Sequence, residues 1–131
     1  MPLHVEVVSP EGLKYEGDAE MVIARTQGGG DIAFLSGHVP FLGALDSWTV
    51  ELRLPDGKDR LAAVHGGFVE VRDDHVTILS DIAEFDDQID VERAKRAAAL
   101  AEERLRTNDD AVAEAALRRA HARLRAAGQE T

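Results

Sequence analysis

Two arginines near the end of the chain have the spacing of residues on one face of a helix. Arg119 and Arg123 are four residues apart, so both side chains lie on one face if this segment is a helix. A guanidinium group presents a rigid fork of N–H donors that matches the oxygens of a phosphate. Several such forks that converge on one site strengthen the binding of a polyphosphate. From these residues alone, the pair is compatible with an anion site and with a solvated basic face of a helix.

Asp90 and Arg93 form a second candidate pair, three residues apart. Asp90 precedes an alanine-rich stretch, where an aspartate carboxylate is a good N-cap for the unpaired N–H groups of a helix. In that structural interpretation Arg93 is only a solvated charge. These residues alone do not decide between two interpretations: the start of a helix, or a part of an anion-binding site.

No group of residues has the pattern of a catalytic or metal site. The five histidines are spread along the chain, and no two have the spacing of metal ligands; they are His4, His38, His65, His75 and His121. His38 has no second histidine or acidic residue nearby in the sequence, which favours a structural or interface role. The glycines at 28–30 are not followed by Lys-Ser or Lys-Thr, so they predict a turn and not a phosphate loop. We predict no catalytic residue and no metal site.

Composition and charge exclude several classes of protein. The chain has 131 residues, no cysteine and a net charge of −10, so disulfides are excluded and a nucleic-acid binder, which carries a basic surface, is not expected. Residues 1–89 hold 6 basic and 17 acidic groups, whereas residues 90–131 hold nine basic and eight acidic groups. This asymmetry indicates two parts with different partners. No apolar run has membrane-spanning length and no signal peptide is recognisable, so we expect a cytoplasmic protein that contacts a membrane only through a partner.

The first 85 residues have the pattern of an all-β domain. Short segments alternate between apolar and polar side chains, and turn signals such as Pro55-Asp56-Gly57 and Asp73-Asp74 separate them. Many short strands at this spacing favour a sandwich or a barrel. At Gly66-Gly67-Phe68 two glycines join two strand signals. This predicts a bulge or a close backbone approach, with Phe68 in the core.

Residues 90–131 predict two helices. Thirteen of these 42 residues are alanine, which has the best helix propensity, and the polar cluster at 107–110 divides the stretch. Apolar residues recur every three or four positions and form one narrow seam: Val91, Ala94, Ala98, Ala101 and Leu105 in the first half, and Ala113, Leu117, Ala120, Leu124 and Ala127 in the second. Two helices with a short loop between them pack antiparallel. Because burial of a methyl group contributes only about 0.8 kcal/mol, we expect this hairpin to detach from the β-domain at small cost.

Three segments, in this order, resemble the epsilon subunit of bacterial F-type ATP synthases. They are Gly30-Asp31-Ile32-Ala33-Phe34-Leu35-Ser36-Gly37-His38-Val39-Pro40-Phe41-Leu42; Val64-His65-Gly66-Gly67-Phe68-Val69-Glu70-Val71, followed by Val76-Thr77-Ile78-Leu79 and Ala83-Glu84; and Ile89-Asp90-Val91-Glu92-Arg93-Ala94. The length and the order of elements also fit, so the resemblance covers the whole chain. Ala33 and Ser36 stand where the family usually has glycine and proline, and the backbone of this loop is expected to differ locally.

The resemblance implies a fold and a role. The fold is α+β, with an N-terminal antiparallel β-sandwich over residues 1–86 and a C-terminal antiparallel two-helix hairpin over residues 87–131. In the family the sandwich binds the gamma subunit and the c-ring at the foot of the central stalk, and transmits torque between proton flow and the alpha/beta catalytic head. The hairpin lies folded on the sandwich or extends up the stalk, where it blocks ATP hydrolysis. The chain is then a non-catalytic rotor subunit that requires no cofactor and lies peripherally on the cytoplasmic face of the bacterial plasma membrane.

The resemblance also assigns roles to residues. In some members the folded hairpin binds regulatory ATP, and the matching positions here are Glu84, Asp90, Arg93, Arg119 and Arg123. Leu100 stands where the ATP-binding members carry a further arginine, and one missing charge-assisted bond weakens binding about 10- to 100-fold.

Two further sets of residues are expected to contact partner subunits. The loop near the c-ring contact carries Phe34, His38 and Phe41. An extended hairpin would present Arg104, Arg106, Arg118 and Arg125 to acidic faces of the head and the gamma subunit. The alternative for these arginines is a solvated helix face with ion pairs four residues apart.

Three other functions stay open at this point. A β-barrel enzyme with a helical tail would need converging histidines and carboxylates and would show turnover of its own. A free-standing ATP sensor without a rotary role would bind nucleotide but would not co-purify with a gamma subunit. The third is a generic scaffold module, and the three ordered motifs weigh against it.

Overall fold

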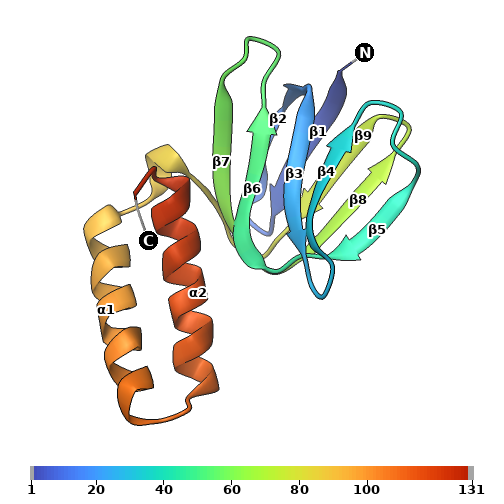
Figure 1. Cartoon of the computed structure of the whole chain (residues 1–131). Coiled ribbons are helices and arrows are strands. Elements are labelled where there is room, and N and C mark those ends of the chain that lie inside the picture. The colour runs from blue at the N-terminus through green and yellow to red at the C-terminus, as the bar shows by residue number, and fades with distance from the viewer. Residues whose placement is uncertain (1, 130–131) are drawn as a thin grey trace.

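The chain folds into a β-sandwich followed by an antiparallel helical hairpin, as the sequence predicts (Figure 1). The computed structural model describes residues 2–129. The strands are β1 (Leu3–Ser9), β2 (Gly12–Ala19), β3 (Met21–Thr26), β4 (Gly30–Leu35), β5 (Phe41–Ala44), β6 (Ser47–Arg53), β7 (Asp59–His65), β8 (Phe68–Arg72), β9 (His75–Leu79) and β10 (Ala83–Phe85). A short 3₁₀ helix, η1 (Asp86–Gln88), leads to α1 (Val91–Thr107) and α2 (Ala111–Ala126). The predicted α+β class is confirmed.

Two five-stranded sheets form the sandwich. One has the strand order β2-β1-β9-β8-β5 and the other has the order β10-β7-β6-β3-β4. Paired strands are antiparallel except that β1 runs parallel to β9, with His4 opposite His75 and Val8 opposite Leu79. The N-terminal strand therefore lies inside its sheet, between the strand that follows it and a strand from much later in the chain.

The two-residue alternation of the sequence places one side of each strand in the core. In β1, Leu3, Val5 and Val7 are buried and the residues between them face outward. The main core consists of Leu3, Val5, Val7, Ala19, Val22, Ala24, Phe34, Leu45, Val50, Leu52, Ala62, Val64, Val69, Val71, Val76, Ile78, Ala83 and Phe85. Every member of this cluster comes from residues 3–85, so the sandwich has a core of its own.

The Gly66-Gly67 turn gives one confirmed prediction and one correction. A Cβ on Gly67 would lie 2.9 Å from Cα of Ser80 and closer still to the carbonyl oxygen of Leu79, so the close backbone approach is present. The prediction that Phe68 lies in the core is wrong, because 54% of this residue is exposed. The register of β8 turns Val69 and Val71 inward and Phe68 outward.

The two helices begin at aspartates. Oδ1 of Asp90 accepts the N–H of Arg93 at 3.1 Å, and Oδ1 of Asp110 accepts the N–H groups of Val112 and Ala113 at 3.0 and 3.1 Å. The bond from Ala113 holds the pKa of Asp110 below its ordinary value. The polar cluster at 107–110 thus divides the hairpin where the sequence predicts.

Helix α2 buries two faces and not one. Toward α1, a seam contains Ala94, Ala98, Ala120 and Leu124, as predicted. On a second face, Ala122 and Ala126 pack against Ala63 of β7 in a cluster that also includes Trp48 of β6. The predicted single seam did not include this second face. Ala122 and Ala126 lie between the seam positions of α2 and, four residues apart, share a face of their own. This second face docks the hairpin on β6 and β7.

Candidate functional site

A cavity of about 240 Å³ lies where the hairpin meets the end of the sandwich. Its lining comes from β10 and η1 on one side and from both helices on the other; the lining residues are Glu84, Gln88, Asp90, Arg93, Ala94, Ala97 and Arg123. Four of the five residues expected at an ATP site therefore surround one space. Because both parts of the chain contribute walls, the cavity is complete only while the hairpin is docked.

Arg123 is fixed by an ion pair with the sandwich. Its Nε donates to Oε1 of Glu84 at 2.8 Å, and both side chains are largely buried. Arg123 lies in the last turn of α2, where a cation also interacts favourably with the helix dipole. A phosphate group entering the cavity must compete with Glu84 for this guanidinium group.

The other expected residues of the site differ in position. Asp90 lines the cavity and caps α1 at the same time. Arg93 lines the cavity and is exposed, whereas Arg119 is half-buried and lies outside the lining. Leu100 is exposed on α1, seven residues after Arg93 and so on the same side of the helix. The basic groups that face the cavity are thus Arg93 and Arg123, one from each helix.

The residues expected at a partner interface form an aromatic cluster between β4 and β5. Phe34 is completely buried, and its ring centroid lies 5.0 Å from that of His38 and 5.5 Å from that of Phe41. Phe34 therefore supports the loop from below and does not reach the surface. His38 and Phe41 are half-buried, and the large apolar side chains exposed beside them are Leu35, Val39 and Leu42.

Asp74 fastens this loop to the turn between β8 and β9. Its carboxylate accepts the N–H of Gly37 at 2.7 Å and the hydroxyl of Ser36 at 3.1 Å. The bond from Gly37, followed by that from Ser36, holds the pKa of Asp74 below its ordinary value. Ser36 stands where the resembling family usually has proline, and a proline could not donate this hydroxyl hydrogen bond.

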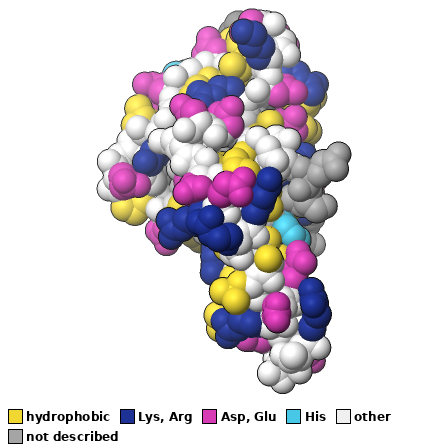
Figure 2. Space-filling view, turned by 90° about the vertical axis from the view of Figure 1, so that its left-hand side faces the viewer, with side chains coloured by type: hydrophobic (Ala, Val, Ile, Leu, Met, Phe, Trp, Pro, Cys, Tyr) yellow, Lys and Arg dark blue, Asp and Glu magenta, His cyan; other side chains and the backbone are white. Residues whose placement is uncertain are grey.

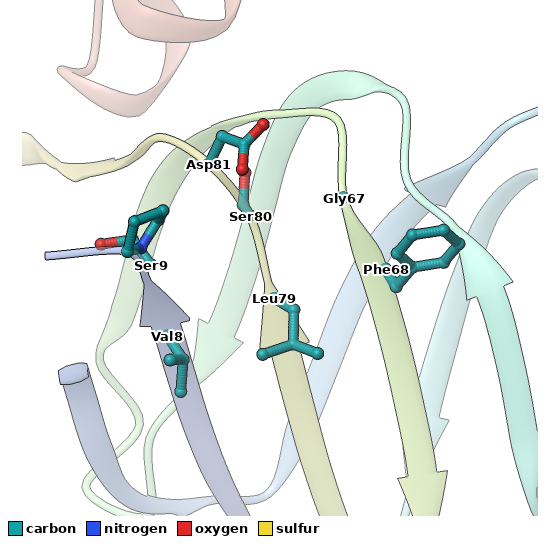
Figure 3. Close-up of a pocket in the computed structure, with 8 residues that line it drawn as sticks. Val8, Ser9, Gly67, Phe68, Leu79, Ser80 and Asp81 are labelled. Carbon is teal, nitrogen blue, oxygen red and sulfur yellow. The ribbon is translucent and has the colours of Figure 1, made fainter. Parts of the chain in front are cut away.

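An apolar groove on the outer face of the β1-β9-β8 sheet was missed by the sequence reasoning (Figure 3). It encloses about 500 Å³ and is lined by Val8, Ser9, Pro10, Gly67, Phe68, Leu79, Ser80 and Asp81. Leu79 is opposite Val8 on one side and opposite Phe68 on the other, so these side chains form a row across three strands. The signal was the alternation in β9, which turns Val76 and Ile78 inward and leaves Leu79 outward.

The arginines expected on an inhibitory arm have different roles in the docked state. Arg104 pairs with Asp110 at 2.8 Å, and Arg125 stacks over Trp48, with its guanidinium carbon 5.3 Å from the ring centroid, and donates to the hydroxyl of Thr49. Arg106 and Arg118 are exposed. Basic and acidic side chains alternate over the hairpin (Figure 2). Arg125 thus helps to hold the hairpin on the sandwich.

Known proteins match this chain over almost its entire length. The beta-sandwich domain of the ATP synthase delta/epsilon chain matches residues 2–86, and the long alpha-helix domain of the same chain matches residues 87–128. The chain belongs to the delta/epsilon chain family of ATP synthases. This confirms the resemblance seen in the sequence.

Relatives from distant bacteria agree with this membership. An ATP synthase epsilon chain from Streptomyces griseus is 47% identical over 95% of this chain and 94% of its own length. One from Bacillus pumilus is 45% identical over 97% of this chain and 98% of its own length. A chain in the cryo-EM structure of the Euglena gracilis mitochondrial ATP synthase has the same fold, with a TM-score of 0.81 over 98% of this chain and 82% of that chain at 24% identity.

Membership in the delta/epsilon family makes this chain a subunit of an ATP synthase and not an enzyme by itself, as the sequence predicts. None of the helices within residues 2–129 combines the length and the apolar character needed to cross a membrane.

One histidine of this delta/epsilon chain has acidic partners that the sequence reasoning missed. Nε2 of His4 lies 3.0 Å from Glu16 and 3.9 Å from Glu6, and Nδ1 lies 3.5 Å from Asp18. Ligand atoms of His4, Glu6 and Glu16 lie within 4.8 Å of one another, close enough to hold a cation. The hydrogen bond to Glu16 is the main cause that raises the pKa of His4. Only the pairing of β1 with β2 brings these exposed groups together, and spacing along the sequence could not reveal it.

Proposed function

We propose that this chain is the central-stalk rotor subunit of a proton-translocating ATP synthase, and that its hairpin restrains ATP hydrolysis when it leaves the sandwich. Residues 1–86 would bind the gamma subunit and the c-ring, and residues 87–131 would reach the alpha/beta head. The subunit would then lie peripherally on the cytoplasmic face of the bacterial plasma membrane. ATP bound at the hairpin cavity would favour the docked state.

The shared cavity is the observation that carries this proposal. Glu84 comes from the sandwich, whereas Asp90 caps α1, Arg93 belongs to α1 and Arg123 to α2. A ligand that touches both parts binds the docked state and loses most of its contacts in the undocked state. It therefore shifts the equilibrium toward docking by its difference in affinity for the two states.

The hairpin is held weakly enough for such a shift to matter. Its contact with β6 and β7 buries Ala63, Ala122 and Ala126, with Trp48, Leu61 and Ile89 partly buried against them, and burial of each alanine methyl group contributes only about 0.8 kcal/mol. The polar contacts that add to it are the Arg123–Glu84 ion pair and the Arg125 contacts with Trp48 and Thr49. No residue of the sandwich core belongs to this contact among residues 2–129, so the hairpin can leave without opening the core.

Removal of Arg123 is expected to weaken ATP binding strongly. The variant Arg123→Gln loses a guanidinium group that lines the cavity, and a charge-assisted bond contributes about 1.5–3 kcal/mol, which corresponds to a 10- to 100-fold loss of affinity. Isothermal titration calorimetry of the whole chain with ATP measures this loss. The matched control is Arg118→Gln, which removes an exposed arginine from the same helix. Equal affinities of the two variants would contradict the assignment of Arg123.

Addition of an arginine at position 100 is expected to strengthen the same site. Leu100 is exposed on the side of α1 that carries Arg93. The cavity now has two carboxylates, Glu84 and Asp90, and two guanidinium groups, Arg93 and Arg123. Leu100→Arg would add a third guanidinium group and give the site a net positive charge. We expect a gain of about 10-fold or more in ATP affinity. Leu100→Gln, which is polar but uncharged, should give little gain, and an equal gain for both variants would mean that charge is not the cause.

The apolar groove supports the assignment of the sandwich as the partner-binding part. Phe68 and Leu79 are exposed, lie opposite each other on β8 and β9, and line this groove, and exposed apolar patches of this kind mark protein interfaces. We expect Leu79→Glu to lose co-purification with the gamma subunit, because a carboxylate is then left in the buried centre of the contact. Val112→Glu changes an exposed apolar residue of α2 and should retain the gamma subunit. Retention by Leu79→Glu would exclude the groove as this interface.

The decisive experiment compares the whole chain with residues 1–88 in ATP hydrolysis by the matching catalytic head with its gamma subunit. If both bind and only the whole chain slows hydrolysis, the rotor role and the hairpin brake are both supported. If both bind and neither slows hydrolysis, the subunit couples without restraint and the brake is excluded. If neither binds, the rotor role fails and a free-standing ATP sensor takes its place.

A further inference from the structure

His65 lies on the face of β7 that carries Ala63, the residue on which Ala122 and Ala126 of α2 pack. It is the last residue of β7, and its backbone N–H donates to the carbonyl oxygen of Ile82 at 3.3 Å. Its side chain is only 5% exposed, and neither ring nitrogen has a hydrogen-bond partner among residues 2–129. Buried polar atoms without partners are rare and costly, so this imidazole needs an explanation that packing does not give.

The groups that face His65 come from three elements. From β10, Oε1 of Glu84 lies 3.4 Å from Nε2 without hydrogen-bond geometry. From α2, Arg123 donates to this same Oε1 at 2.8 Å, and Arg119 is the second positive charge that acts on the ring. From β6, the residue opposite His65 is the uncharged Ser47. One carboxylate therefore faces two guanidinium groups, and a proton on His65 would add a third positive charge to this group.

We propose that His65 makes the docking of the hairpin depend on pH. Docking of α2 covers the imidazole and brings two arginines toward it, whereas undocking removes the cover and both positive charges. A proton on His65 is therefore accepted more readily when the hairpin has left. Glu84, which remains on the sandwich and loses Arg123 on undocking, then becomes the free partner of the protonated ring.

The direction of the pH dependence follows from the pKa of His65 in the two states. Burial lowers this pKa below its ordinary value of 6.5 in the docked chain, and the charge of Arg123 lowers it further, against the opposing effect of Glu84. Above the pKa of the undocked state neither state holds the proton, and docking has its full strength. As the pH falls from that value toward the lower pKa of the docked state, the undocked state binds more protons and docking weakens. Each unit of difference between the two pKa values corresponds to about a tenfold change in the docking equilibrium.

The pH dependence of docking does not require the proposed function. Only its effect on ATP hydrolysis rests on that function. If the released hairpin restrains hydrolysis, acidification would bring on the restraint, and ATP at the shared cavity would oppose it through the linkage between the two ligands. Glu84 and Arg123 belong to both the cavity and the surroundings of His65. His65 itself does not line the cavity. It would therefore affect ATP binding only through the equilibrium between the docked and undocked states.

Docking can be followed in the isolated whole chain, without ATP or partner subunits, by double electron–electron resonance. This method measures the distance between two spin labels. Spin labels at Lys58→Cys and Glu114→Cys, both exposed, report the distance between the sandwich and α2, and the chain has no other cysteine. Between about pH 7.5 and about pH 5.5 we expect the ratio of docked to undocked chain to fall by about tenfold or more. In His65→Gln, which keeps a polar side chain but cannot be protonated, we expect the ratio to stay constant over this range.

A matched control separates this effect from other titrations. His121 lies on α2 and its Nε2 is 3.9 Å from Glu102 of α1, so His121→Gln makes the same substitution at another histidine, one that faces α1 and lies outside the docking contact. This variant should keep the pH response. A constant docked fraction in the unmodified chain, or an unchanged response in His65→Gln, would overturn the inference. Because this measurement needs no nucleotide and no hydrolysis, its failure leaves the proposed function standing, and a failure of ATP binding leaves the pH response standing.

Discussion

Ala122→Glu will release the hairpin from the sandwich and leave the sandwich folded. Ala122 is completely buried in the cluster with Ala63, so a longer, ionised side chain at this position has neither room nor a partner. Burial of an unpaired carboxylate costs several kcal/mol, and undocking avoids this cost because the face then opens to water. We expect the ratio of docked to undocked chain to fall at least about 100-fold, which corresponds to about 2.7 kcal/mol.

The labels at Lys58→Cys and Glu114→Cys measure this change at neutral pH, and NMR spectra of the β-domain report whether the sandwich persists. Ala99→Glu makes the same chemical change at an exposed position of α1 and should leave the hairpin docked. Inhibition of ATP hydrolysis should increase in Ala122→Glu, since the hairpin is then free to reach the head. A hairpin that stays docked would contradict the role of the second face of α2. Loss of the β-domain signals would contradict a separate core.

The sequence predicted elements better than it predicted their partners. The alternation in β1 and the aspartates before α1 and α2 are local signals, and the structure confirms them. The edge strand β2 carries little alternation, with only Ala19 buried, so periodicity could not reveal it. The parallel pairing of β1 with β9 depends on the packing of the whole sandwich, and no pattern within either strand specifies it.

The sequence did not reveal the contacts within the candidate site. The resemblance named Glu84, Asp90, Arg93, Arg119 and Arg123; the first three and Arg123 line one cavity and Arg119 does not, and ATP binding there stays a prediction. The ion pair between Glu84 and Arg123 exists because the second face of α2 docks on β6 and β7, which the single predicted seam did not include. The environment of His65 was hidden for the same reason, since the charges that surround it come from β10 and from α2.

Gly67→Ala will destabilise the sandwich by at least about 3 kcal/mol. Gly67 has φ +110°, a conformation that costs an L-residue about 1–2 kcal/mol. The new Cβ would also clash with backbone atoms of Leu79 and Ser80. These atoms cannot move away easily, because Leu79 is paired with Phe68 in the ladder between β8 and β9 and the carbonyl of Gly67 accepts the N–H of Leu45 at 2.8 Å. Denaturant unfolding followed by β-sheet circular dichroism measures the loss.

Gly66→Ala separates the clash from the backbone strain. Gly66 has φ +79° with open space where a Cβ would lie, so this variant should lose only about 1–2 kcal/mol. The difference between the two variants then reports the clash alone, and equal losses would contradict it. Because Gly67 and Leu79 both line the apolar groove, relief of the clash must displace one wall of that groove. At a temperature where both variants remain folded, Gly67→Ala should therefore bind the gamma subunit more weakly than Gly66→Ala does.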